Sequence, residues 1–342
     1  MARVLVTGSA GFIGGYLVAE LLDRGYEVVG LDNYSKYGRV ARAHDEHPRF
    51  AQTEGDAKDS VLLSSLLEGC EYLVAGAARI GGISYFHRYA YDLLAENERI
   101  TASTLDAATA AHRRQSLRRV VVISSSMVFE SARDFPSREG DELRIPPPSS
   151  SYGFQKLATE YFARAARDQH GLPFTIVRPF NCVGIGEARA AGAPEILSGN
   201  ISLALSHVVP DLCQKVLKGQ DPLHILGSGR QIRHYTYGGD IARGIVMAME
   251  QPDAEGEDFN ISTATSTSVL ELAERIWQRV HGRRNKPFRF VSDPPYPHDV
   301  QERIPDTSKA LRVLGFQAST SLDQMLSEVI PWIAAQIEAG RM

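Results

Sequence analysis

A tyrosine and a lysine four residues apart, Tyr152 and Lys156 in SYGFQKLA, have the types and the spacing needed for proton transfer. Residues four apart share one face of a helix, so the Lys156 ammonium can lie near the Tyr152 phenol and favour its anion. Such a phenol can act as a general base near neutral pH. Ser125 ends the apolar run VVVISSS and can hydrogen-bond the same reacting hydroxyl. The pair also fits an ordinary amphipathic helix face, so its meaning depends on the rest of the chain.

Three glycines at spacings of three follow the apolar run VLV, in the stretch TGSAGFIG, and the segment GYLVAELLDRG comes next. Between a buried strand and a helix, Gly8 permits a tight turn, Gly11 lets the backbone approach a pyrophosphate and Gly14 lets the helix pack on the sheet. The amino terminus of the helix, with Phe12 and Ile13, then faces the phosphate charge. This turn predicts a dinucleotide site.

Asp32 closes the second apolar run, YEVVGLD, eighteen residues after Gly14. A carboxylate at this point can accept hydrogen bonds from both hydroxyls of the adenine ribose and would repel a 2′-phosphate. The sequence therefore favours NAD over NADP. Lys36 and Arg39 lie close enough in the sequence to keep NADP as an alternative.

The elements that must position these residues alternate along the first half of the chain. Short β-branched runs such as ARVLVTG, EYLVAGAA and FTIVRPF alternate with longer segments of helical periodicity, which predicts a doubly wound α/β fold with a parallel sheet. We expect a Rossmann domain over residues 1–179 and a smaller carboxy-terminal α/β substrate domain over 180–342. Part of 235–262 is expected to return to the first domain.

Composition excludes several classes of partner. The 342 residues are 43% hydrophobic and 23% charged with a net charge of -4, which predicts a globular protein with no polycationic face for nucleic acid or anionic membrane. No apolar stretch approaches the length of a membrane span. Cys70, Cys182 and Cys213 form no CxxC pair, which argues against a structural zinc site and favours a reducing cytoplasm.

Taken together, these motifs resemble the extended short-chain dehydrogenase/reductase family, specifically its nucleotide-sugar epimerases and dehydratases. The matching pieces run along nearly the whole chain: TGSAGFIG, GDAKD, AGAAR, AENERITASTLDAA, SSS, Tyr152 with Lys156, RPFN and RQIRHYTYGGD. The segments AARIGGISYFH and SHVVPDL are similar to GDP-fucose synthase and GDP-mannose 3,5-epimerase.

This resemblance implies binding roles. Asp56 and Ala57 would flank the adenine, Pro179 and Phe180 would lie near the nicotinamide, and Arg233 would present its fork of donors to the substrate diphosphate. The expected cofactor residues are Gly8, Gly11, Phe12, Ile13, Gly14, Asp32, Asn33, Asp56, Ala57, Ala77, Arg79, Asn97, Ser124, Tyr152, Lys156 and Pro179. The expected substrate residues are Ser125, Ser126, Asn181, His207 and Arg233.

Within the family, the reaction depends on the residues after the serine. Dehydratases carry Asp-Glu there as acid and base, whereas this chain has Ser126 and Met127, and a thioether cannot move a proton. The synthase and the 3,5-epimerase carry a Cys at the position of Met127. His207 matches the catalytic His of the synthase and could be an acid, but it could equally cap a helix or bind substrate. Glu130, three residues after Met127, is a weaker candidate for the missing proton carrier.

By elimination, the sequence predicts an NAD-dependent NDP-sugar epimerase that inverts carbon 4 through a transient 4-keto sugar nucleotide. The alternatives are a 3,5- or 5-epimerase and a 4,6-dehydratase or decarboxylase of the same family. A non-catalytic dinucleotide sensor would share the fold, but it would not need Tyr152 and Lys156.

The resemblance also implies a homodimer through the helices that carry Asn97 and Tyr152. Residues 187–199 are expected to close over the substrate. Relatives often bind the diphosphate with an arginine three residues before the Asp of PHDV, where this chain has Tyr296, and Arg303 could compensate.

Overall fold

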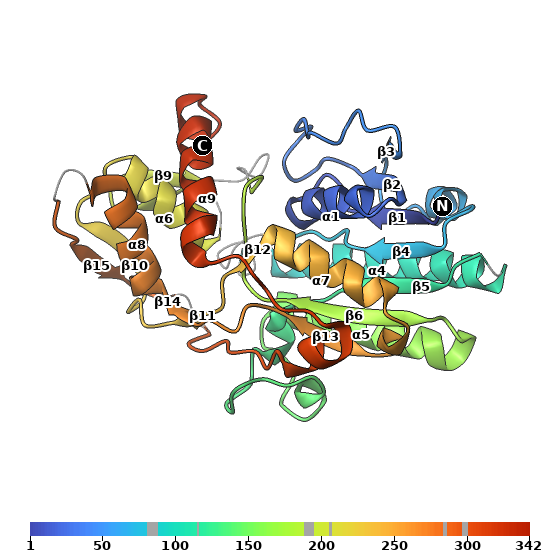
Figure 1. Cartoon of the computed structure of the whole chain (residues 1–342). Helices are drawn as coiled ribbons and strands as arrows, with labels where there is room; N and C mark the ends of the chain where they lie inside the picture. Colours follow the sequence, from blue (N-terminus) through green and yellow to red (C-terminus); the bar gives the residue numbers. More distant parts are fainter. Residues whose placement is uncertain (81–87, 115, 188–194, 205–206, 283–285, 296–299) are drawn as a thin grey trace.

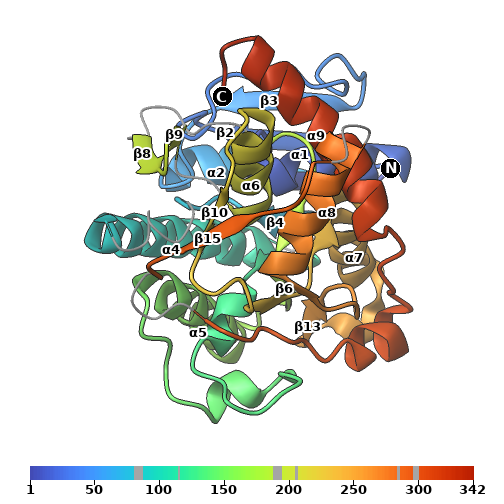
Figure 2. The same cartoon turned by 90° about the vertical axis from the view of Figure 1, so that its left-hand side faces the viewer.

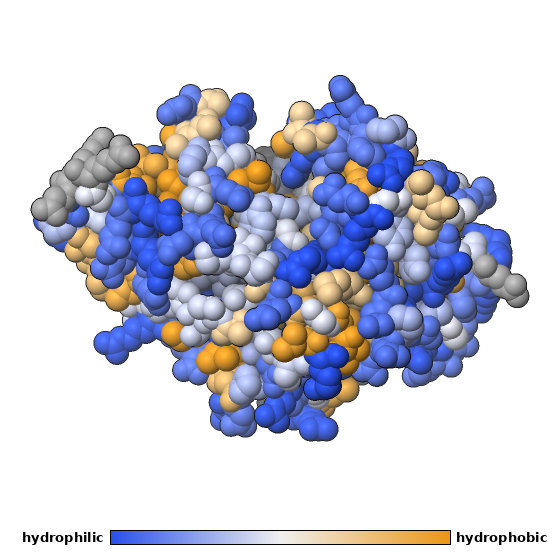
Figure 3. All heavy atoms as spheres, in the orientation of Figure 1, coloured by the Kyte–Doolittle hydropathy of each residue, from blue (hydrophilic) through white to orange (hydrophobic). Residues whose placement is uncertain are grey.

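The computed structural model describes residues 1–80, 88–114, 116–187, 195–204, 207–282, 286–295 and 300–342. They form two lobes, a larger one built on a parallel sheet and a smaller one that contains the carboxy-terminal helix (Figure 1). The surface is indented between the lobes at the top of the same view (Figure 3). No helix in these ranges is both long and apolar enough to cross a membrane.

The larger lobe contains seven described strands that pair in parallel, in the order β13-β6-β5-β4-β1-β2-β3. Consecutive residues of these strands face opposite sides: Val4 and Val6 contact one core cluster and Leu5 contacts the other. Both faces are therefore covered, as a parallel sheet requires. The strands are β1 (Arg3–Thr7), β2 (Glu27–Asp32), β3 (Phe50–Glu54), β4 (Tyr72–Ala75), β5 (Arg119–Ile123), β6 (Phe174–Pro179) and β13 (Asp258–Ile261).

Helices cover the two faces of this sheet. On one side α1 (Phe12–Asp23) packs against α7 (Gly238–Glu250), and on the other α2 (Ser60–Leu66), α4 (Ala90–Arg113) and α5 (Ser151–His170) pack together. The prediction of a doubly wound α/β sheet is confirmed. Two short 3₁₀ segments, η1 (Ser126–Phe129) and η2 (Asp141–Leu143), lie between β5 and α5.

The helix that carries Tyr152 and Lys156 has clear end signals. The Ser150 hydroxyl accepts a hydrogen bond from the Gly153 amide at 3.0 Å, and Gly171 ends the helix in the left-handed conformation with φ of 70°. These signals fix where α5 starts. They therefore fix which residues of its first turn face the ends of β4 and β5.

The smaller lobe has its own core, formed by α6 (Val208–Leu217), α8 (Val269–His281) and α9 (Leu322–Glu338). Figure 2 shows the molecule with this lobe toward the viewer. Its strand pairs are short. They comprise β8 (Glu195–Ser198) with β9 (Ile201–Ala204), β10 (Leu223–Leu226) with β15 (Phe290–Asp293), and β11 (Ile232–Arg233) with β14 (Thr267–Ser268).

Two segments connect the lobes. β12 (Thr236–Tyr237) pairs with β7 (Cys182–Val183), and the chain then passes through α7 to β13, which pairs with β6. These contacts support the proposal that part of 235–262 belongs with the first domain. The boundary between 179 and 180 stays a prediction.

Candidate active site

One cavity of about 1520 Å³ runs from the glycine turn, past the ends of β4 and β5, to the wall formed by α6 and β10. It brings together residues from both lobes that are far apart in the sequence. All the expected cofactor and substrate residues line it except Asn97. Phe180, expected near the nicotinamide, is fully buried in a neighbouring core cluster and does not line the cavity.

The glycine turn fits a dinucleotide. Gly8 has φ of 75°, and a Cβ at Gly14 would lie 2.1 Å from the Gly8 carbonyl oxygen, so neither position accepts a side chain without a shift of the backbone. Gly11 precedes α1, and no side chain caps the helix there. The first amides of α1 at Phe12 and Ile13 thus line the cavity where an anionic group would be stabilised.

Asp32 is fixed at the end of β2. Its carboxylate accepts the Ala10 amide at 3.0 Å and the Tyr34 amide at 2.8 Å, and burial raises the pKa of this carboxyl. Arg39 forms an ion pair with Glu54, and its guanidinium lies over the Tyr34 ring. Arg39, one of the two cations that could favour NADP, is therefore occupied, whereas Lys36 lines the cavity. The position of the Asp32 carboxylate fits NAD.

The loop after β4 is held by Asn97. The Asn97 amide accepts the Arg79 N–H at 2.6 Å and donates to the Arg79 carbonyl at 2.9 Å, while Ala77 donates its amide to the Thr7 hydroxyl. Asn97 was expected to bind the cofactor directly. In the structure it instead fixes the backbone of Arg79, which lines the cavity, because the Asn97 side chain is buried in α4.

The predicted catalytic residues meet in the cavity. Tyr152 is buried and its hydroxyl is hydrogen-bonded with Ser125, and Ser125 also accepts the Met127 amide at 3.2 Å. The Lys156 ammonium donates to the Ile123 carbonyl at the end of β5, at 2.9 Å. Burial lowers the pKa of Lys156 to about 8, although the charge of Glu160 opposes this shift.

The charge of Arg303 acts on the Tyr152 phenol. Burial raises the pKa of Tyr152, and the hydrogen bond with Ser125 and the charge of Arg303 both oppose the rise. The Lys156 ammonium, which is expected to favour the anion, donates to the Ile123 carbonyl, and its effect on the phenol stays a prediction. Arg303 also contacts the Met127 sulfur at 2.8 Å, so a positive charge lies at the reacting end of the cavity.

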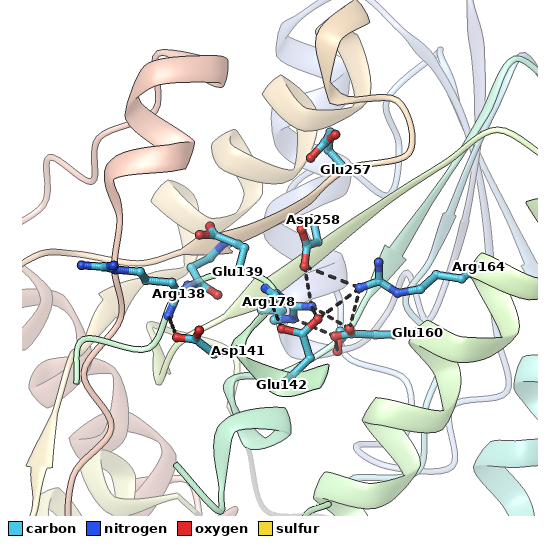
Figure 4. A network of polar contacts seen from close by, with 12 residues as sticks. Arg138, Glu139, Asp141, Glu142, Glu160, Arg164, Arg178, Glu257 and Asp258 are labelled. Carbon is cyan, nitrogen blue, oxygen red and sulfur yellow. Dashed lines mark hydrogen bonds and ion pairs between the residues drawn. The ribbon is translucent and has the colours of Figure 1, made fainter. Parts of the chain in front are cut away.

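A buried ion network surrounds Arg178 (Figure 4). The Arg178 guanidinium, fully buried on β6, contacts Glu142 at 2.9 Å, Glu160 at 2.6 Å and Asp258 at 2.6 Å. Glu160 lies one helical turn after Lys156 and also accepts the Ser124 hydroxyl at 2.6 Å. Ser124, expected at the cofactor, thus connects the cavity wall to this network.

Asn181, which is expected to bind the substrate, adopts a positive φ of 36° two residues after the end of β6, a conformation that costs free energy and is concentrated at functional sites. Arg233 is buried and donates to the carbonyl oxygens of Val300 and Gln301. The Glu130 carboxylate accepts from Ser149 and Ser150 at the start of α5. It is thereby held as a structural group.

His207 precedes α6, but its side chain does not cap that helix. Its Nδ1 pairs with the buried carboxylate of Glu187. Burial would raise the pKa of Glu187, but the positive charge and hydrogen bond of His207, with the charge of Lys36, hold it below its usual range. Helix capping and substrate binding were the two alternatives to an acid role for His207, and the structure does not show the capping.

Residues near Glu187 join the substrate segment to the cofactor side. The Ile185 amide donates to the Tyr16 hydroxyl of α1 at 2.8 Å. Arg42 donates to the Ala10 and Gly11 carbonyl oxygens of the glycine turn. Of residues 187–199, which are expected to close over the substrate, 188–194 lie outside the described residues, as does Tyr296.

Some cavity residues had no sequence signal. Glu187 lies in a glycine- and alanine-rich stretch without a period, and Tyr235 lies within the motif RQIRHYTYGGD, where only Arg233 was assigned. The cavity wall also carries the ion pair of Asp211 and Lys215 at 2.9 Å. That pair reads in sequence as an ordinary i, i+4 helix pair.

Comparison with known proteins agrees with this geometry. The family model described as "NAD dependent epimerase/dehydratase family" matches residues 4–262. The chain belongs to this family. It is an NAD-dependent enzyme of the nucleotide-sugar epimerase and dehydratase class.

Relatives align along nearly the whole chain. It is 30% identical to the UDP-N-acetyl-alpha-D-glucosaminuronate decarboxylase of Bacillus cytotoxicus, over 96% of this chain and 97% of the relative. It is 27% identical to the UDP-glucose 4-epimerase of Bacillus subtilis, over 98% of this chain and 97% of the relative. The solved UDP-glucuronic acid 4-epimerase of Bacillus cereus, in complex with UDP-glucuronic acid and NAD, superimposes with a TM-score of 0.78 at 25% identity, covering 97% of this chain and 99% of that one.

Proposed function

We propose that this enzyme inverts carbon 4 of an NDP-sugar through a transient 4-keto sugar nucleotide. The observation that carries the proposal is the set of side chains around Ser125 at the end of β5. Met127 stands where dehydratases of the family need a proton carrier, Arg303 contacts its sulfur, and Glu130 is held by two serines. Tyr152 is then the proton carrier at this end of the cavity. Epimerisation at carbon 4 needs a single proton carrier.

In this mechanism Tyr152 removes the proton from the 4-hydroxyl, and Ser125 hydrogen-bonds the same oxygen. NAD supplies the oxidising and reducing chemistry at carbon 4, and the glycine turn and Asp32 would hold it. Once the ketone has turned in the cavity, Tyr152 returns the proton to the oxygen. Lys156 holds the end of β5 and α5 together through the Ile123 carbonyl.

The experiment is proton NMR of UDP-, GDP- and dTDP-hexoses incubated with the purified enzyme. We expect one sugar nucleotide to interconvert with its 4-epimer without added reductant. Tyr152→Phe should lower kcat by about 100-fold or more while NAD stays bound. Tyr161→Phe, on the exposed face of the same helix, is the matched control. Irreversible loss of water or carbon dioxide from the substrate would contradict the proposal, and an unchanged biological activity of Tyr152→Phe would favour the non-catalytic sensor.

A second candidate is epimerisation beside the ketone, at carbon 3 or 5. The pairing of His207 with the buried Glu187 favours it, since a carboxylate that orients an imidazole is a common arrangement for proton transfer. The two candidates differ in heavy water: the carbon-4 reaction returns the same hydrogen to the ring, whereas the second reaction introduces deuterium from solvent.

A homodimer through α4 and α5 is also proposed. These helices lie side by side (Figure 2) and expose Tyr91, Phe154, Tyr161 and Phe162. Exposed aromatic residues grouped on neighbouring helices are typical of protein interfaces. The cytoplasmic location predicted from the cysteines remains a prediction.

A further inference from the structure

Three side chains of α5 bond three consecutive residues at the end of β5. They lie four residues apart on the helix, so they share one of its faces. The contacts are those of Tyr152 with the Ser125 hydroxyl, of Lys156 with the Ile123 carbonyl at 2.9 Å, and of Glu160 with the Ser124 hydroxyl at 2.6 Å. The first two contacts belong to groups that the proposed mechanism uses. The third contact has no role in it so far.

The Ser124 hydroxyl is not needed to build the sheet. The Ser124 amide donates to the Val177 carbonyl at 2.8 Å, and this backbone bond continues the pairing of β5 with β6. The Ser124 and Glu160 side chains belong to residues that are 3% and 0% exposed. The hydroxyl therefore connects the end of β5 to α5 in the interior, in addition to the bonds of the sheet.

Glu160 is a fixed acceptor because Arg178 holds both of its carboxylate oxygens (Figure 4). The Arg178 Nε donates to Oε1 at 2.7 Å, and Nη2 donates to Oε2 at 2.6 Å. A two-point contact between a guanidinium and a carboxylate fixes the direction of both groups. The Ser124 hydroxyl donates to Oε1 as well. Removing that hydroxyl would leave the buried carboxylate still paired with Arg178.

The position of Ser124 in the chain gives this bond a chemical consequence. Ser124 lies directly between Ile123, which accepts the Lys156 ammonium, and Ser125, which is hydrogen-bonded with Tyr152. A shift of Ser124 relative to α5 would therefore change the distance between the Ser125 and Tyr152 hydroxyls. A displacement of about 1 Å can lower the rate of an enzyme by 100-fold.

We propose that Ser124 and Glu160 are positioning residues, whose hydrogen bond fixes the Ser125 hydroxyl relative to the Tyr152 phenol. The inference rests on the proposed function in taking those two hydroxyls as the groups that contact the reacting oxygen. In this role neither Ser124 nor Glu160 exchanges a proton with the substrate, and Ser124 does not need to bind the cofactor.

The test compares Ser124→Ala with Thr175→Val, which removes another buried hydroxyl from the same sheet. The Thr175 hydroxyl donates to the Ala254 carbonyl at 2.6 Å, and Thr175 does not line the cavity. Each variant loses one buried hydrogen bond, so both should melt below the wild type. Only Ser124→Ala should lower kcat, by about tenfold, with KM unchanged within about twofold. The substrate is whichever sugar nucleotide the wild type converts.

Hydrogen exchange of the η1 amides, measured by mass spectrometry on the enzyme with its bound NAD, is a readout that needs no turnover. Ser124→Ala should exchange faster there than the wild type, and Thr175→Val should not. Unchanged exchange, an unchanged kcat, an equal fall in kcat for both variants, or loss of bound NAD from Ser124→Ala would overturn the inference. If the wild type converts no sugar nucleotide, the proposed function fails, and the exchange rates alone decide whether the bond holds this segment.

Discussion

Lys156 shows how a residue proposed for catalysis can oppose stability. Its ammonium is buried with one carbonyl partner, and its pKa of about 8 means that the folded chain binds this proton less tightly than the unfolded chain does. Unfolding therefore takes up a proton between about pH 8 and 10.5, and the free energy of unfolding rises with pH across that window. Below pH 8 the cost is present in full.

We expect Lys156→Met to stabilise the protein at pH 7, by about 3 kcal/mol at most, and to lower kcat, because α5 loses its bond to the end of β5. The stability gain should shrink as pH rises from 8 to 10.5, because the wild-type lysine loses its charge in the folded state. Chemical unfolding of the variant and the wild type at a series of pH values measures this difference in the free energy of unfolding. Lys218→Met, partly exposed after α6, is the control; a gain that is independent of pH would contradict the assignment.

The residues with local signals were predictable from the sequence. A single turn and the end of one strand place Gly8, Gly11 and Asp32, and one turn of a helix relates Tyr152 to Lys156. The spacing of these residues in the sequence therefore predicts their arrangement. The sequence did not predict Arg303 as a cation acting on Tyr152, because the two residues are far apart in the chain and only the tertiary fold brings them together. The bond between Ser124 and Glu160 was not predicted for the same reason.

At the scale of elements, the network around Arg178 joins β6, β13, α5 and η2. Burial raises the pKa of Asp258, but the charges of Arg178, Lys309 and Arg164 prevail and lower it to about 2. A carboxyl with a lowered pKa contributes stability above its unfolded pKa and loses it as pH falls through the folded value. This contribution is roughly 2 kcal/mol at neutral pH.

We therefore expect Asp258→Asn to destabilise the protein at pH 7 by about 3 kcal/mol, because it leaves buried cations short of a partner. The difference from the wild type should narrow as pH falls from about 4 to 2. Melting temperatures over this range test the effect, with the exposed Asp253→Asn as control. A difference that stays constant down to pH 2 would show that the Asp258 charge is not what stabilises the network.

At the scale of the whole molecule, the proposed dimer would place α4 and α5 of two copies together. Light scattering after gel filtration should give twice the chain mass for the wild type. Replacing Tyr161 and Phe162 together by glutamate should give a monomer, because four charges would enter an apolar interface. The pair Val61→Glu and Leu311→Glu, at exposed positions on other elements, should remain dimeric. A wild type of single-chain mass would reject the dimer.

The hydrogen bond from the Ile185 amide to the Tyr16 hydroxyl connects the segment around Ile185 to the first half of α1, close to the glycine turn. A dinucleotide seated on that turn would lie beside this segment, and the carbon-4 mechanism proposed above keeps it bound throughout. Each catalytic cycle would then begin and end with the same captive molecule in its oxidised form. The rate of sugar interconversion in the cell would follow sugar supply alone, whatever the ratio of free NAD to NADH.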